Sequence, residues 1–247
     1  MRDGSEMVTQ IAWAITGAGH FLQETFDVMD KLVKNNKATV TTFLSSAGEQ
    51  VVKMYGLRNK LEQISSGAYL QEIFTENKDD PGCSHTGRFI LDLYSALVVS
   101  PASGNTVAKI ANGIADTVVT NAVAQAQKAN VPVYVVPTDQ REGSVETVLS
   151  CRVDRTACKQ CEPCAVVESC SFSAVKLVDG IPKIDSVLCH GCGVCVTSCK
   201  FGAVKCGEKK KMLIRSVDVQ NVKKLQSISN MTVLEHPKQI EAVIGKL

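Results

Sequence analysis

The chain has 247 residues, of which 45% are hydrophobic, and its formal net charge at pH 7 is +2. This composition is that of a folded globular protein, and the low aromatic content of 5% excludes a stacking platform for nucleic-acid bases. The sequence shows no signal-peptide pattern and no apolar run long enough to span a membrane. We therefore expect a cytoplasmic protein without a nucleic-acid or membrane partner.

Short apolar runs alternate with helical stretches from residue 8 to residue 139. Strands are predicted at 10–15, 38–44, 69–74, 96–100 and 131–136. Helices are predicted from residue 20 to 34, over the apolar positions between 51 and 61, at 88–94, and over most of 105–130. Apolar strands separated by helices are typical of a parallel sheet that is covered on both faces. The fold class predicted is α/β, with a doubly wound parallel sheet of the Rossmann or flavodoxin kind.

The last part of the chain continues this pattern after a region rich in cysteine. Strands are predicted at 212–217 and 231–234, and helices at 219–228 and 237–247. We therefore expect one sheet domain formed by residues 1–149 and 213–247, with residues 150–212 inserted as a second domain.

Three predicted loops follow strands of this sheet, where doubly wound proteins bind their ligands. They are Thr16–His20, the pair Ser45 and Ser46, and Pro101–Thr106. The first precedes a helix, and helix N-termini bind phosphate. The third glycine of a dinucleotide fingerprint is Leu22 here, and the acidic residue expected about twenty positions on is missing. A mononucleotide phosphate therefore fits these loops better than a dinucleotide.

Eight of the eleven cysteines form two compact sets. The first reads Cys158-Lys-Gln-Cys161-Glu-Pro-Cys164 with Cys170 following, and the second reads Cys189-His-Gly-Cys192-Gly-Val-Cys195 with Cys199 following. Three cysteines separated by two residues each, with a fourth further along, are typical of four-iron clusters. Where two such runs occur together, the remote cysteine of each run is usually a ligand of the other run's cluster. The predicted ligand sets are Cys158, Cys161, Cys164 and Cys199 for one cluster, and Cys189, Cys192, Cys195 and Cys170 for the other.

Two alternatives to iron, zinc and disulfides, fit this spacing less well. Structural zinc sites use pairs of ligands rather than triplets, and disulfide frameworks belong to small secreted domains. Cys83, Cys151 and Cys206 lie outside both sets, and each is expected to be a small buried apolar residue.

The segment 151–212 resembles the bacterial-type ferredoxins with two four-iron clusters. Its two runs end in similar tails, Cys170-Ser-Phe-Ser-Ala-Val and Cys199-Lys-Phe-Gly-Ala-Val. Ser171 and Lys200 stand where that family has proline, and the first run has two extra residues before Cys170. His190, between two ligands, is a candidate for tuning one cluster, although an exposed bystander is the simpler interpretation.

The stretch Pro101-Ala-Ser-Gly-Asn-Thr106 resembles the flavoprotein family of phosphopantothenoylcysteine decarboxylases and flavin prenyltransferases. The resemblance implies FMN, with Thr16, Gly17, Ala18, Gly19, Ser45 and Ser46 at its phosphate and ribityl chain. It implies that Pro101, Ala102, Ser103, Gly104, Asn105 and Thr106 lie near the ring. Gly104 replaces the usual alanine, which would let the backbone approach the flavin more closely. The family also implies a homo-oligomer based on trimers.

Decarboxylase activity is not implied, because Pro137-Thr-Asp-Gln-Arg-Glu-Gly143 replaces that branch's substrate clamp. Gly87 or Arg88 stands where its catalytic histidine is expected, and His85 is close to that position. Asn105 and His85 are the candidate catalytic residues. A solvated loop histidine is the alternative interpretation of His85.

The combination of a flavin sheet with an inserted ferredoxin resembles the archaeal dihydromethanopterin reductase family. It implies that reduced ferredoxin, or a similar low-potential donor, feeds two clusters, and that FMN passes hydride to a dihydropterin. Segment 151–212 has ten Lys and Arg against six Asp and Glu, and Lys209–Lys211 is a candidate docking site for an acidic donor. The alternatives are an electron relay without an organic substrate and a non-redox FMN enzyme with structural clusters.

Overall fold

The computed structural model describes residues 8–76, 83–149, 151–185, 188–189 and 191–247. The chain divides into two compact units. The first consists of Met1–Glu49, Asn59–Ser144 and Leu213–Leu247, and the second of Gln50–Arg58 and Val145–Met212. The second unit thus contains the whole cysteine region and also a short piece from the first half of the chain.

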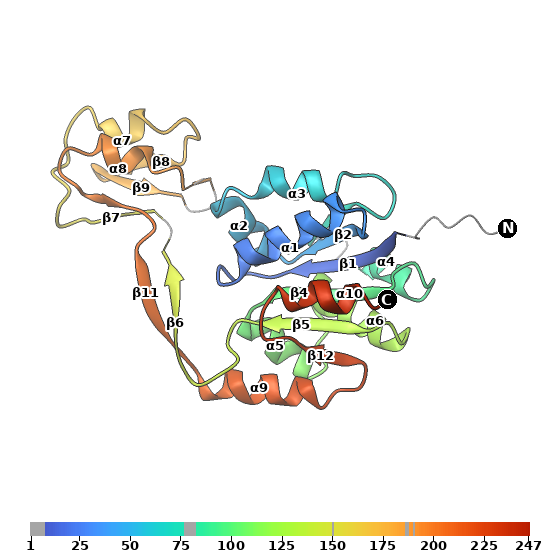
Figure 1. Cartoon of the computed structure of the whole chain (residues 1–247). Coiled ribbons are helices and arrows are strands. Elements are labelled where there is room, and N and C mark those ends of the chain that lie inside the picture. Colours follow the sequence, from blue (N-terminus) through green and yellow to red (C-terminus); the bar gives the residue numbers. More distant parts are fainter. Residues whose placement is uncertain (1–7, 77–82, 150, 186–187, 190) are drawn as a thin grey trace. The chain divides into compact units, whose positions relative to one another are not determined.

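The first unit is built on a six-stranded parallel sheet (Figure 1). Its strands are β1 (Thr9–Ile15), β2 (Ala38–Leu44), β3 (Ile73–Thr75), β4 (Ala96–Ala102), β5 (Val133–Pro137) and β12 (Met231–Val233). They lie in the order β3-β2-β1-β4-β5-β12, so the direction of winding reverses between β1 and β4. The predicted doubly wound parallel sheet is confirmed, and its switch point lies beside the end of β1.

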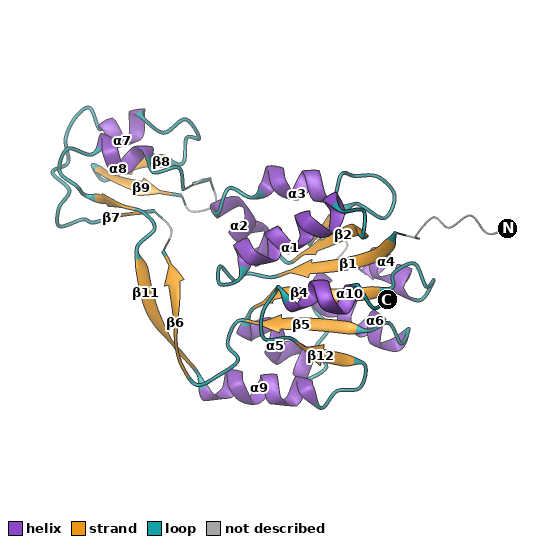
Figure 2. Ribbon diagram, viewed as in Figure 1, coloured by secondary structure: helices purple, strands orange, loops and turns teal. Residues whose placement is uncertain are grey.

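Helices cover both faces of the sheet (Figure 2). They are α1 (Leu22–Lys34), α2 (Ser46–Met54), α3 (Arg58–Ile64), α4 (Cys83–Thr86), α5 (Gly104–Ala111), α6 (Val118–Lys128), α9 (Ser216–Gln226) and α10 (Gln239–Ile244). Ala12 and Ala14 of β1 join the core formed with α5, α6 and α9, and the alternate residues Ile11 and Trp13 are also fully buried. Burial on both faces explains why the strands are apolar throughout.

The predicted helix over residues 105–130 is interrupted. Helix α5 ends where Gly113 adopts a φ of 70°, a conformation that suits glycine. Helix α6 begins at a capping box in which Thr117 and Thr120 bond each other's backbone amides. The stretch predicted as a helix at 88–94 contains only a 3₁₀ turn at Gly87–Phe89.

The second unit contains three two-stranded sheets and two short helices (Figure 1). Its elements are β6 (Gly143–Val148), β7 (Arg152–Val153), α7 (Ala165–Glu168), β8 (Val175–Val178), β9 (Ile181–Ile184), α8 (Val194–Ser198), β10 (Val204–Lys205) and β11 (Lys209–Ile214). Strand β6, which begins within the first unit, pairs with β11 in a ribbon that the sequence did not predict.

The duplication seen in the cysteine runs extends to the backbone. Gln160 and Gly191 occupy equivalent places and have φ values of 50° and 65°. Ser173 and Gly202, also equivalent, have φ values of 51° and 62°. One copy therefore uses glycine at both left-handed positions, and the other accommodates side chains there.

The core of the second unit is small. Its buried residues are Cys164, Val166, Val175, Cys195 and Val204. Two of these five are candidate cluster ligands, so thiols make up a large part of this hydrophobic cluster. Among the described residues, no helix combines the length and apolarity that crossing a bilayer requires.

Candidate functional site

The first predicted set of ligands lies around one cavity of the second unit. Cys158, Cys161, Cys164 and Cys199 all line it, together with apolar side chains that include Pro163 and Phe201. Cys164 precedes the first turn of α7, and Cys199 follows the last turn of α8. Because α7 and α8 pack against each other, the remote cysteine of one run reaches the triplet of the other.

The second set lies around a separate cavity. Cys170, Cys189, Cys192 and Cys195 line it, with Ala174, Val175 and Ile184 on its apolar side. Burial raises the pKa of the Cys195 thiol, and the charges of Cys189, Cys192 and Cys170 add to this effect. All eight cysteines are free thiols in the structure. The structure thus brings together each set of four that the spacing predicted.

In the first unit, Thr16 joins the loops that follow β1 and β4. Its hydroxyl donates to the carbonyl of Pro101 at 2.7 Å and accepts from the amide of Ser103 at 2.8 Å. Thr16 is fully buried. Its hydroxyl therefore positions the two loops that meet at the switch point, rather than facing solvent.

Unpaired amides remain in the loop after β1. The backbone N–H groups of Gly17, Gly19 and His20 donate no hydrogen bond to any residue that the structure describes. A Cβ at position 17 would lie 2.5 Å from the Cβ of Ala47, so only glycine fits between this loop and the start of α2. This loop therefore offers several donors to an anion.

Ser45 and Ser46 have partners of their own. The Ser45 hydroxyl accepts from the amide of Gly48 at 3.0 Å and caps α2. The amide of Ser46 donates to Glu76 at 2.8 Å, its hydroxyl bonds the same carboxylate, and the amide of Val118 donates to Glu76 at 3.2 Å. Glu76, which the sequence reasoning missed, thus supplies a negative charge to the N-termini of both α2 and α6.

The stretch after β4 forms the start of α5. Ser103 is its N-cap and accepts from the amide of Thr106. Asn105 is exposed on the first turn, whereas Pro101, Ala102 and Thr106 are buried. Of the predicted ring contacts, Asn105 is therefore the side chain most open to a ligand.

Two carboxylates crowd Gly104. A Cβ at this position would lie 3.0 Å from Oδ1 of Asp218 and 3.1 Å from Oδ2 of Asp139. Asp218 is buried and accepts two hydrogen bonds from Arg215, at 2.8 and 2.7 Å, while Asp139 accepts from Thr138 at 2.9 Å. The pair with Asp218 raises the pKa of Arg215 above its usual value. The space left by the missing methyl group thus faces acidic side chains.

His20 lies at the end of the loop that follows β1. Its ring lies 3.9 Å from that of Phe21, whose other neighbour is His236 at 5.1 Å. Burial lowers the pKa of His20, although the charges of Glu24 and Asp139 oppose the change. Sequence reasoning placed this histidine at the end of the 16–20 loop but assigned it no role of its own.

His85 lies against the edge strand β3. Its ring stacks on Phe74 at 3.9 Å with an interplanar angle of 14°. Arg88, which stands near the place of the family's histidine, donates to both oxygens of Glu72 at 3.0 and 2.9 Å. β3 is two strands away from β1, so these groups are not brought to the β1–β4 switch point by the sheet order.

The remaining predictions have mixed outcomes. Cys151 and Cys206 were each expected to be a small buried apolar residue. Cys151 is buried as expected, but the two cysteines face each other at the ends of β7 and β10 and form a disulfide, which the sequence did not predict. Lys209 pairs with Glu146 at 2.8 Å across the β6–β11 ribbon. His190 and the side chain of Cys83 lie outside the described residues.

Known proteins resemble this chain along its whole length. Residues 3–151 match the flavoprotein family, and residues 181–204 match the 4Fe-4S binding domain family. A dihydromethanopterin reductase (acceptor) of Methanosarcina mazei is 47% identical over 94% of this chain and 97% of its own length. A protein of the same name from Methanocaldococcus jannaschii is 43% identical over 94% of each chain.

A solved structure shares the fold. DmrB of Burkholderia xenovorans, crystallised with FMN and described as a cubic protein cage for redox transfer, aligns with a TM-score of 0.62 and 22% identity. The alignment covers 98% of this chain and 96% of DmrB. This alignment, like those with the two archaeal relatives, includes both the sheet unit and the cysteine-rich unit. The chain belongs to the flavoprotein family and, within it, to the family of dihydromethanopterin reductases (acceptor), which are oxidoreductases.

Proposed function

We propose that this protein reduces dihydromethanopterin to tetrahydromethanopterin, with FMN at the switch point of the sheet and two [4Fe-4S] clusters in the second unit. The observation that carries the proposal is the combination of a flavoprotein sheet and two four-cysteine cavities in one chain. The relatives that share nearly its full length carry the name of this activity.

The cysteine sets fit the proposed clusters by their chemistry. Each cavity has four thiols and a mostly apolar lining, and thiolates are the ligands of iron–sulfur clusters. Cys158, Cys161, Cys164 and Cys199 would hold one cluster, and Cys189, Cys192, Cys195 and Cys170 the other. A bound cluster would also compensate for the small apolar core of the second unit.

The loops at the switch point fit FMN less directly. The free amides of Gly17 and Gly19 are suited to its phosphate. Ser45, Ser46 and Thr16 would act chiefly by holding the loops, because their hydroxyls already have partners. Exposed Asn105 would orient the flavin ring, together with the backbone of Pro101–Thr106.

When bound, the clusters exchange single electrons and FMN exchanges electrons singly or in pairs, which suits a one-electron donor and a two-electron acceptor. The chain's own residues would bind and orient these groups. Asp139 lies beside Gly104 and is partly exposed, so its carboxylate is the described acidic group best placed to face the pterin ring. His85, stacked on Phe74, would act by packing rather than as an acid or base.

The proposed partner is reduced ferredoxin or a similar low-potential donor. Lys210 and Lys211 would receive its acidic surface, because Lys209 is paired with Glu146. A homo-oligomer built from trimers is supported by the cubic cage described for DmrB, since cubic symmetry contains threefold axes. We place the protein in the reducing cytoplasm, where open thiolate sites are protected from oxidation.

An anaerobic single-turnover assay tests this function. The reconstituted chain would be reduced by a one-electron donor, freed of excess donor and mixed with dihydromethanopterin while flavin absorbance is followed. Reoxidation of the flavin in proportion to the pterin is expected. A flavin that is oxidised by an artificial acceptor but not by dihydromethanopterin would favour an electron relay instead.

Two further measurements test the cofactors. The reconstituted chain should contain about eight irons, the content of two four-iron clusters. Cys192→Ala should slow flavin reduction by the donor while leaving bound FMN in place. Unchanged turnover in a folded Cys192→Ala protein would contradict the redox role of the clusters and favour a non-redox FMN enzyme.

A further inference from the structure

The Cys151–Cys206 disulfide closes the base of the cysteine region. Cys151 precedes β7 and Cys206 follows β10, and these strands pair with Arg152 opposite Lys205. On the other side of the disulfide, the amide of Gly207 donates to the carbonyl of Leu149 at 3.1 Å. The bond thus joins cysteines 55 residues apart, between the β6–β11 ribbon and the β7–β10 pair.

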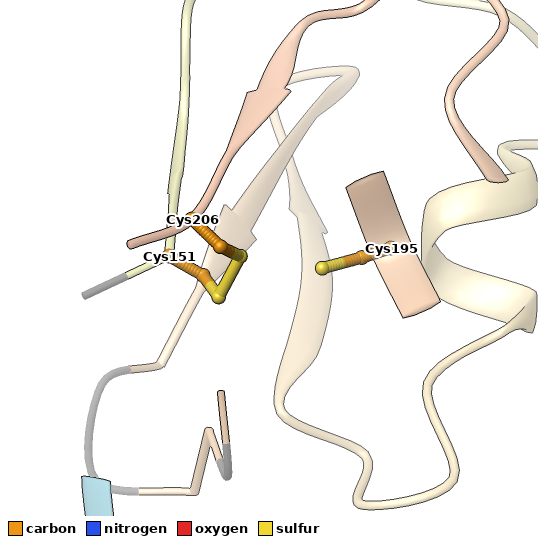
Figure 3. Close-up of side chains that lie close together, drawn as sticks. All are labelled: Cys151, Cys195 and Cys206. Carbon is orange, nitrogen blue, oxygen red and sulfur yellow. A yellow bond between two sulfur atoms is a disulfide. The ribbon is translucent and has the colours of Figure 1, made fainter. Parts of the chain in front are cut away.

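A third sulfur lies beside this bond. The Sγ atoms of Cys151, Cys206 and Cys195 all lie within 4.8 Å of one another, and Figure 3 shows the Cys195 side chain pointing toward the disulfide. Cys195 belongs to the second ligand set. Cys151 also lines the cavity around which that set is arranged. The disulfide is therefore a neighbour of the second proposed cluster, not a remote surface staple.

The position is sheltered from solvent. Cys151 is 7% exposed and Cys195 is 8% exposed, and Cys206 packs against the same small core. Soluble thiols therefore have limited access to the bond. The Sγ atom of Cys195 lies within 4.8 Å of both sulfurs of the disulfide, which favours electron transfer from within the protein.

We propose that Cys151 and Cys206 form a redox-active dithiol–disulfide pair that takes electrons through the centre held by Cys195. The proposal rests on the cluster assignment made above. It gives the second unit a two-electron acceptor of its own, separate from FMN. Reduction would open the covalent link between the entry and the exit of the cysteine region.

The reaction balances as a two-electron reduction. Two electrons from a low-potential one-electron donor, of the class that feeds the proposed enzyme, arrive one after the other. The S–S bond breaks, two protons are taken from water, and two thiols form. The donor is oxidised twice in the process. Reoxidation by a disulfide or by an oxidised one-electron carrier reverses the change.

Thiol labelling tests the pair without relying on enzyme activity. The full chain with its clusters, and the same chain after anaerobic removal of iron by a chelator, would each be mixed with photoreduced methyl viologen. Samples would be quenched in acid and alkylated, and labelling of Cys151 and Cys206 would be measured by mass spectrometry. Reduction at least tenfold faster in the cluster-loaded chain is expected.

Dithiothreitol serves as the matched control, because it reduces disulfides without a cluster. If removal of iron merely loosened the fold, dithiothreitol would reduce the stripped chain faster as well. The ratio of the viologen rate to the dithiothreitol rate therefore isolates the contribution of the cluster, and it should fall at least tenfold on stripping. An unchanged ratio in a chain with its full iron content would overturn the pair and leave the proposed function intact.

A double variant separates this role from metal ligation. Cys151→Ser/Cys206→Ser should keep the full iron content and change the electron paramagnetic resonance signal of only one cluster. Loss of about half the iron would show that the two residues are ligands and would overturn the proposal. A wild-type chain that binds no iron under reconstitution would overturn both the pair and the proposed function.

Discussion

Gly104 and Asp218 approach each other so closely that a Cβ on the glycine would lie 3.0 Å from the carboxylate oxygen. Asp218 cannot easily retreat, since it is buried and held by two hydrogen bonds from Arg215. Alanine, the usual residue of the family, is therefore unsuited to this position because its methyl group would crowd Asp218 of the protein itself. The glycine was expected to admit the flavin, and the structure adds that it admits an acidic side chain.

Gly104→Ala should destabilise the first unit by about 1–2 kcal/mol, because an added methyl group in a packed site forces its neighbours to shift. The free energy of unfolding would be measured in urea through the fluorescence of Trp13, the only tryptophan, which is fully buried in β1. Gly87→Ala is the matched control, since a Cβ there would have nothing within 4 Å. Equal effects of the two substitutions would contradict the crowding at Gly104.

His20 should make the stability of the first unit depend on pH near neutrality. Burial lowers its pKa in the folded state below the reference of 6.5, so the unfolded chain binds the proton more readily. Stability should be highest above that value and fall as the pH drops through 6.5 toward the lowered pKa. His20→Gln should flatten this part of a urea-unfolding series from pH 8 to pH 5.5. A slope identical to that of the wild type would argue against the burial of this histidine.

Glu72 should stabilise the first unit while it is ionised, and this contribution should be lost in a more acidic pH range than that of His20. Burial is the largest single influence and opposes its ionisation, but the hydrogen bonds from Arg88 and from the backbone, together with the Arg88 charge, outweigh it, so the folded-state pKa lies below the reference of 4.5. Its contribution is present above pH 4.5 and is lost as the pH falls through the lowered pKa.

Glu72→Gln should cost about 1.5 kcal/mol of stability at pH 7, the lower end of the range for a hydrogen bond to a charged group. The cost should shrink below pH 4.5. Glu235→Gln is the control, because its pair with Arg141 is mostly exposed and should contribute little. If both substitutions lowered stability alike at pH 7, the half-buried pair would have no special role.

Prediction from the sequence was most reliable for those elements whose structure depends on the local residue pattern alone. Strand β2 has the bounds that its run of apolar and β-branched residues indicated, Ala38–Leu44. The grouping of each triplet with the remote cysteine of the other run was likewise predictable, because each triplet lies in one short loop and the run is duplicated. Strand β11 was placed too late, because Lys209–Lys211 looks like a solvated charge run and its strand depends on pairing with β6.

Contacts between distant segments were not predictable in the same way. Nothing near Ser46 in the sequence indicates that Glu76 will bond it, and nothing near Thr16 indicates that Pro101 will accept from its hydroxyl. Hydroxyls expected to be free for a cofactor were therefore already engaged. Nothing near Asp218 in the sequence indicates that its side chain is buried beside Gly104, and only the tertiary fold shows it.

The proposed exchange of fourth ligands between the two cysteine runs has a consequence for iron content. Cys170 lies with the second triplet and Cys199 with the first. Cys170→Ala should therefore damage the same centre as Cys192→Ala, and Cys199→Ala the same centre as Cys161→Ala. Each single variant should lose up to about half of the iron, because one of two clusters loses a ligand.

The double variants distinguish this exchange from a local arrangement. Cys170→Ala/Cys192→Ala removes two ligands from one cavity and should lose no more iron than the worse of its single variants, leaving one cluster with a normal paramagnetic signal. Cys170→Ala/Cys161→Ala removes one ligand from each cavity and should damage both clusters. The reverse outcome would show that each run holds its own cluster. In that case, the contact between α7 and α8 would pack the unit without sharing ligands between its halves.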